Sequence, residues 1–205
     1  MKNKSMNNKG FSLIEVIVAV LIIAIIGSVA VVSFNAVWST KTESAAKKLA
    51  DTMKVARTKA MALENKTVSL SGAPTTSDVY VKIYTANSLL NADVCTGYYK
   101  EETDEHGVTT SKRDENPIHQ RELGSDGLSV EVYDTSENKI GTVGSDVVKI
   151  YFKKETGGIA AVEVKGDTSE TYYDVGILKV KNVTEDFRDL IMVALTGRCY
   201  IDRTE

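Results

Sequence analysis

The sequence predicts an α+β protein, in which one long N-terminal helix packs on an antiparallel β-sheet domain. Two observations carry this prediction. No proline occurs between Phe11 and Lys66, and the apolar residues in the second half of that segment recur at helical spacing. From Thr67 onward the period changes to two, and Val, Ile, Tyr and Phe alternate with polar residues. This alternation is typical of half-buried antiparallel strands.

The first segments of the chain predict a membrane protein. Residues 1–10, MKNKSMNNKG, are basic and contain no acid, and residues 11–34 form an apolar run. The run is long enough to cross a hydrocarbon core of ~30 Å as a helix. The leader lysines favour a cytoplasmic N-terminus. We therefore expect a single-pass membrane protein with an extracytoplasmic C-terminal domain.

Glu15 interrupts the apolar run near its start. A carboxylate at membrane depth is costly, so such a residue is a functional hypothesis. The alternative is a plain signal anchor in which the acid stays hydrated near the interface. No A-x-A-like cleavage site follows the run, and the sharp small-residue junction is Gly10-Phe11, on its N-terminal side.

Lys9-Gly10, Phe11 and Glu15 within an unbroken apolar helix resemble the class III signal of type IV pilins and type II secretion pseudopilins. The resemblance implies that a prepilin peptidase cleaves after Gly10 and methylates the Phe11 amine. It also implies that Glu15 meets the Phe11 amine of a neighbouring subunit, which suits two charges that are each costly in lipid alone. The implied partners are other pilin or pseudopilin subunits, a membrane assembly platform and the lipid bilayer. The family's usual proline is absent, and Gly27-Ser28 stands in this segment instead.

Residues 35–66 are predicted to form the amphipathic half of the same helix. Its apolar face is expected to lean on the sheet, although a basic amphipathic helix can also lie on a lipid surface. The residues of this face recur at steps of four and three: Ala45, Leu49, Met53, Ala56, Ala60 and Leu63.

Residues 67–205 are predicted to form the β domain. Segments of alternating polarity are expected as strands over residues 67–71, 78–86, 128–134, 147–154, 160–165, 175–183 and 188–198. Between residues 91 and 127 the sequence is polar, charged and aperiodic, so we expect an exposed insertion there, mobile around residues 100–117.

Three short motifs resemble the minor pseudopilin H and FimT group. They are Ala56-Arg57-Thr58-Lys59-Ala60 at the end of the helix, the strand and glycine turn VKIYFKKETGG over residues 148–158, and Gly197-Arg198 near the end of the chain. This resemblance implies a minor subunit rather than a major one.

Two cysteines, Cys95 and Cys199, fall in the part expected outside the cytoplasm. An oxidising exterior favours a disulfide between them. The alternative is two unpaired thiols, one of them buried as a small hydrophobic residue.

Metal binding and catalysis find little support. His106 and His119 flank an acidic loop without any metal-ligand spacing, so a solvated loop is favoured. Residues 134–141 alternate oxygen donors but lack the glycine and glutamate of a calcium loop, which favours a hairpin turn. No catalytic or phosphate-binding motif occurs. We expect no enzyme, no metal and no cofactor.

The formal net charge of −3 argues against nucleic acid as a partner, because removal of the three leader lysines makes the chain still more acidic. Some FimT-like minor pilins bind DNA, and Arg188, Arg198 and Arg203 are the candidate contacts here. The rival from another class is a signal-anchored extracellular binding module or adhesin that never assembles.

Overall fold

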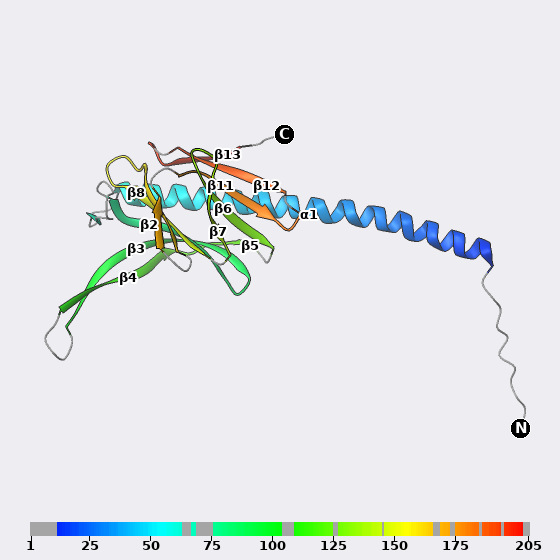
Figure 1. Ribbon diagram of the computed structural model, residues 1–205, viewed down its shortest axis with the longest axis horizontal. Coiled ribbons are helices and arrows are strands. Elements are labelled where there is room, and N and C mark those ends of the chain that lie inside the picture. Colours follow the sequence, from blue (N-terminus) through cyan, green and yellow to red (C-terminus); the bar gives the residue numbers. More distant parts are fainter. Residues whose placement is uncertain are drawn as a thin grey trace, which may run out of the picture. The chain divides into compact units, whose positions relative to one another are not determined.

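The computed structural model describes residues 12–62, 67–68, 76–103, 109–124, 127–144, 146–165, 169–172, 175–184, 186–193 and 195–202. Helix α1 spans Leu13–Ala62, and antiparallel strands follow it (Figure 1). The predicted α+β class is confirmed. The chain divides into two compact units, Met1–Val37 and Trp38–Glu205, and each is described by itself.

Two antiparallel sheets make up the β part of the second unit. Sheet A runs in the order β10-β9-β8-β2-β3-β4, with β1 on β2 and β5 on β3, and sheet B runs β13-β12-β11-β6-β7. The strands are β1 (Thr67–Val68), β2 (Thr76–Ala86), β3 (Leu89–Thr103), β4 (Thr109–His119), β5 (Glu122–Gly124), β6 (Leu128–Asp134), β7 (Lys139–Val143), β8 (Val147–Lys153), β9 (Ile159–Lys165), β10 (Ser169–Tyr172), β11 (Val175–Asn182), β12 (Phe187–Val193) and β13 (Arg198–Asp202).

The strands predicted from alternation are largely present. Those expected over residues 78–86, 128–134, 147–154, 160–165 and 175–183 correspond to β2, β6, β8, β9 and β11. The strand expected over residues 188–198 is instead two strands, β12 and β13, which pair with each other. Gly197 explains the break, because its φ of +62° turns the chain where a continuous strand was predicted.

The exposed, aperiodic insertion predicted over residues 91–127 contains regular strands, and its base is buried. Strands β3 and β4 form a long hairpin, which pairs from Val94↔His119 to Thr103↔Thr109 (Figure 1). The base of the hairpin is buried at Ala92, Val94 and Cys95. Backbone pairing with β2 and β4, rather than side-chain alternation, makes this segment a strand.

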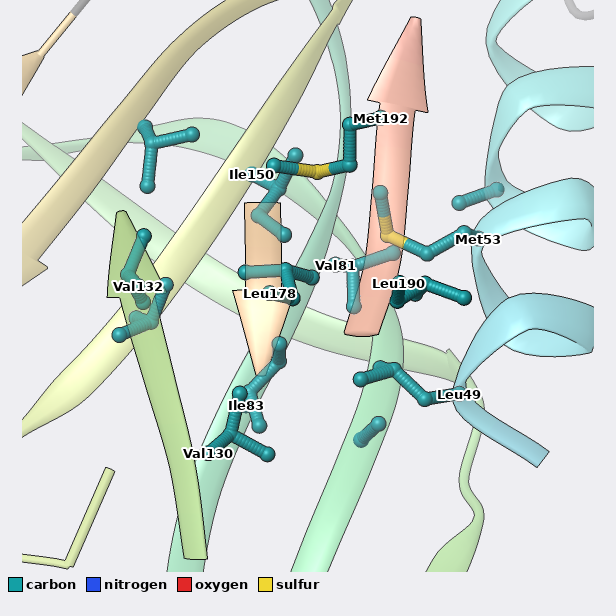
Figure 2. Packing of buried hydrophobic residues seen from close by; sticks show 14 of the residues in the cluster. Leu49, Met53, Val81, Ile83, Val130, Val132, Ile150, Leu178, Leu190 and Met192 are labelled. Carbon is teal, nitrogen blue, oxygen red and sulfur yellow. The ribbon is translucent and has the colours of Figure 1, made fainter. Parts of the chain in front are cut away.

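The core lies between the two sheets and the second half of α1. The predicted helix face is confirmed, because Ala45, Leu49, Met53, Ala56 and Ala60 are all fully buried. Leu63 lies outside the described residues. Leu49 and Met53 point from the helix toward the strands, where core residues of sheet A and sheet B meet them (Figure 2). These strand residues include Val81, Ile83, Ile150, Leu178, Leu190 and Met192.

A membrane-spanning helix was predicted over residues 11–34. Within the residues that the structure describes, no helix is both long and apolar enough to cross a membrane.

Candidate functional site

The start of α1 places Glu15 in the first helical turn. The backbone N–H groups of Glu15 and Val16 both donate to the carbonyl oxygen of Ser12, at 3.0 and 3.2 Å. The Glu15 side chain is exposed. A carboxylate in the first turn interacts favourably with the positive end of the helix dipole. Gly10 and Phe11, the predicted processing residues, lie outside the described residues.

Around Glu15 and in the turns that follow it, the helix exposes bulky apolar side chains on every side. Each is between 49% and 78% exposed: Leu13, Ile14, Val16, Ile17, Val18, Val20, Leu21, Ile22, Ile23, Ile25 and Ile26. A surface of this size and polarity is unstable in water and marks a site of interaction with other apolar surfaces.

The first turns of α1 in the second unit are fastened to sheet B by polar contacts. The buried Thr42 hydroxyl donates to the carbonyl of Trp38 at 2.9 Å and accepts from the amide of Asn182 at 2.7 Å. Arg188 donates to the hydroxyl of Ser39 at 3.3 Å. Gly127 fits against Trp38, since a Cβ there would lie 2.7 Å from the indole ring. These contacts fix residues 38–42 in the domain, and no pattern in the sequence predicts them.

The three motifs that resemble the pseudopilin H and FimT group meet at the other end of α1. Arg57 donates through Nε to the carbonyl of Thr196 at 2.5 Å. A Cβ on Gly157 would lie 3.0 Å from Arg57 Cγ, and one on Gly197 would collide with the carbonyl oxygen of Gly157. The Gly157 turn, the Gly197 turn and the Arg57 side chain therefore pack together, and a side chain at either glycine would separate them. The motifs were found in the sequence, but their contact was not predicted.

The predicted disulfide is not formed. Cys95 and Cys199 are both free. Cys199 packs against the main core, whereas Cys95 belongs to a separate cluster with Tyr80, Tyr151 and Ala160. Side chains alternate along a strand, so Cys95 faces away from the core residues Ala92 and Val94 of its own strand. Burial raises the pKa of the Cys95 thiol to about 11 and that of Cys199 to about 12, which makes both poor nucleophiles.

Two of the arginines predicted to contact DNA, Arg188 and Arg198, lie on the paired strands β12 and β13. Arg188 pairs in register with Val180, and Arg198 pairs with Val193, five residues farther along β12. Arg188 is also held by Asp186, at 3.1 Å between Nη1 and Oδ1. Arg203 lies outside the described residues. A stretch of five strand residues spans roughly 16 Å, which is the separation of Arg188 and Arg198 along the strands, and their contact with DNA stays a prediction.

The segment considered as a calcium loop is a hairpin turn. Asp134 Oδ1 accepts from the backbone N–H of Ser136 at 2.9 Å and of Asn138 at 2.7 Å, and Oδ2 accepts from the Asn138 amide at 3.0 Å. These hydrogen bonds hold the Asp134 carboxylate within the turn. Among the described residues, no group of three or more His, Cys, Asp or Glu side chains is arranged to hold a metal. His106 lies outside these residues.

Comparison with known families adds one finding to this geometry. Residues 5–31 match the family described as the prokaryotic N-terminal methylation motif. The N-terminal segment of the chain thus carries a methylation motif. The match covers Gly10, Phe11 and Glu15, and it supports a type IV pilin-like protein that prepilin peptidase processes and that assembles with other pilin subunits. No curated protein and no solved structure matches the chain.

Proposed function

We propose that this protein is a structural subunit of a type IV pilus or of a type II secretion-like pseudopilus. The observation that carries the proposal is the methylation motif over residues 5–31, followed directly by a helix with exposed apolar side chains from Leu13 to Ile26. In an assembled filament, these side chains pack against the same helix of neighbouring subunits. Burial of each such side chain contributes roughly 1.5–3 kcal/mol, so the helix supplies much of the driving force for assembly.

In this proposal, Glu15 supplies specificity. After cleavage between Gly10 and Phe11, the Phe11 amine of a neighbouring subunit is the cation that satisfies the Glu15 carboxylate. A buried charge pair of this kind stabilises little by itself, but removal of one partner leaves an uncompensated charge. Correct axial register of two subunits therefore depends on the contact between Glu15 and the amine.

The finer assignment is a minor subunit of the pseudopilin H and FimT type. Support comes from the packing of Arg57 against the turns at Gly157 and Gly197, because these are the motifs on which that resemblance rests. The signal implies a membrane-anchored precursor that assembles at the cell surface. We further propose a cytoplasmic N-terminus and an extracytoplasmic β domain.

The experiment that tests the proposal is the N-terminal residue and mass of the protein from cells with and without prepilin peptidase. A chain that begins at Phe11, carrying a methyl group, only when the peptidase is present is the expected result. Gly10→Ala is the conservative control and should be at least partly processed, whereas Gly10→Leu should block cleavage. A chain that keeps Met1 in both strains contradicts the proposal and favours a signal-anchored binding module.

A further inference from the structure

The face of sheet B turned away from the core carries an apolar row that crosses four strands. Tyr200, Ile191, Ile177 and Tyr133 are consecutive register partners on β13, β12, β11 and β6. The alternate residues Leu178, Leu190 and Met192 face the core and are buried. In contrast, the row residues are partly exposed, and Tyr200 at the edge is 52% exposed. Apolar side chains aligned across a sheet are suited to contact with another protein surface.

Two carboxylates lie beside this row, and on the same face of the sheet Lys179 pairs with Asp189 while Lys139 and Lys181 pair with Glu131. Asp189 and Asp202 are direct register partners on β12 and β13, and like charges in that position are destabilising. Asp189 Oδ1 is buried, accepts no hydrogen bond within the described residues and lies 3.7 Å from Lys179 Nζ. Burial raises the pKa of Asp189, Lys179 offsets this only in part, and the Asp202 charge adds to the rise. A cation supplied by a partner would relieve both effects.

A second surface, whose cations outnumber its acids, lies on the outer side of α1. A shallow groove there is lined by Asp51, Lys54, Val55, Thr58 and Lys59 of the helix and by Arg121 beyond β4. Val55 is half-buried against the core. The groove therefore offers an apolar side chain flanked by three cations, of which Arg121 lies 3.6 Å from the Asp51 carboxylate.

Charge is also distributed unevenly along the chain. Residues 35–66 carry seven basic and three acidic side chains, whereas residues 67–205 carry 15 basic and 24 acidic ones. The helix is thus basic and the β part is acidic within one molecule. Complementary charges of this kind favour contact between two copies and fix its register.

We propose that the outer face of sheet B in one subunit docks on the α1 groove of a second copy, with Asp189 and Asp202 facing Lys54, Lys59 and Arg121. Since the two surfaces are different, the contact leaves one free surface of each kind, and it propagates into an open assembly rather than closing a dimer. The inference rests on the proposed function and specifies which surfaces of the globular part meet.

The first test uses the full-length protein in detergent micelles with the photo-crosslinker p-benzoylphenylalanine at position 200. The expected product is a covalent dimer whose crosslinks map to residues 54–59 or to Arg121. The same crosslinker at the exposed Thr85 on sheet A is the matched control and should give little dimer. Absence of dimer throughout the soluble concentration range, or crosslinks that map elsewhere, would overturn the proposal.

The second test reverses charge on each surface. Asp202→Lys and Lys54→Glu should each reduce the crosslinked dimer roughly tenfold, and the double variant should recover most of it. Glu155→Lys makes the same charge change at an exposed turn and should leave the yield unchanged. Failure of the double variant to recover would count against the assigned pairing of surfaces.

The two proposals fail in distinguishable ways. If the chain is processed to Phe11 and assembles, but the crosslinks map elsewhere, the docking surfaces are wrong and the proposed function stands. If the crosslinks map to the groove but the chain keeps Met1 in the presence of the peptidase, the docking surfaces stand and the proposed function fails.

Discussion

At the residue scale, Glu15 has a local role that is smaller than its proposed role in assembly. The carboxylate lies in the first turn of α1, where it interacts with the helix dipole. At an exposed position this interaction contributes about 0.3–1 kcal/mol. A loss of that size does not unfold a helix of 50 residues. The assembly role, in contrast, depends on the charge itself.

We therefore predict that Glu15→Ala is cleaved at Gly10 normally but is strongly depleted from sheared filaments. Glu15→Asp keeps the charge on a shorter side chain and should restore part of the incorporation. The measurement is the ratio of filament-associated to cell-associated protein, with the N-terminal mass as the control for processing. Full incorporation of Glu15→Ala would remove the proposed pairing with the Phe11 amine.

Also at the residue scale, Gly197 is predicted to be irreplaceable. Its φ is +62°, and a Cβ would collide with the carbonyl oxygen of Gly157. Gly197→Ala should lower the free energy of unfolding by about 1–3 kcal/mol, because it combines backbone strain with the clash. Gly144 is the matched control, since a Cβ there meets nothing within 4 Å. Gly144→Ala should be neutral or slightly stabilising in the same urea titration.

At the scale of the element, Glu115 ties β4 to strands beyond its neighbour. Gly97 stands opposite Glu115 on β3 and has no side chain to block its path. Glu115 pairs with Lys82 of β2 at 2.7 Å and with Lys149 of β8. Lys149 also lies over the ring of Tyr80, 5.5 Å from its centroid. The edge strand is thus held by charge where apolar packing is sparse.

This ion pair predicts a pH dependence. Burial alone would raise the pKa of Glu115, but hydrogen bonds from Lys149 and Lys82 outweigh it and lower the pKa from 4.5 to about 2. The folded-state value lies below the ordinary one, so the stabilisation is present above pH 4.5 and is lost as the pH falls toward 2. Between pH 5 and pH 3, Tm should therefore fall less in Glu115→Gln than in the unsubstituted protein. The control Glu155→Gln lies at an exposed turn, and its Tm should fall as much as that of the unsubstituted protein. An equal decrease of Tm with pH in all three proteins would refute the role of Glu115.

The elements differ in how far the sequence predicts them. β6 and β11 each have one buried and one partly polar face. Apolar and polar residues therefore alternate along them, and this alternation predicts both strands. The base of β3 is buried on both faces, since Ala92 and Val94 enter the main core and Cys95 the outer cluster. Asp93, buried between them, is satisfied by the hydroxyl of Tyr84 at 2.8 Å. Apolar and polar residues do not alternate in such a segment, so a prediction of strands from that alternation fails there.

At the scale of the whole molecule, local patterns predict the processing segment better than they predict long-range contacts. Gly10, Phe11 and Glu15 form a contiguous motif that needs no fold to be recognised. The contacts of Arg57 with Thr196 and of Asn182 with Thr42 join residues 139 and 140 positions apart. Contacts between residues so far apart in the chain depend on how the helix and both sheets pack around one core. The sequence predicts the helix and most of the strands but not this packing.

The predicted disulfide failed for the same reason, and the structure predicts two free thiols in its place. An oxidising location favours a bond only between cysteines that the fold brings together. The intact protein should have the mass of the fully reduced chain and should yield two thiols to a thiol reagent in denaturant. Reductant should leave Tm unchanged, since no crosslink is removed.

In the native state both thiols should react slowly, because burial raises the pKa of Cys95 to about 11 and that of Cys199 to about 12, so the thiolate is scarce at neutral pH. A mass about 2 Da lower that returns with reductant, together with a fall in Tm, would show that Cys95 and Cys199 pair and that sheets A and B are arranged differently from this structure.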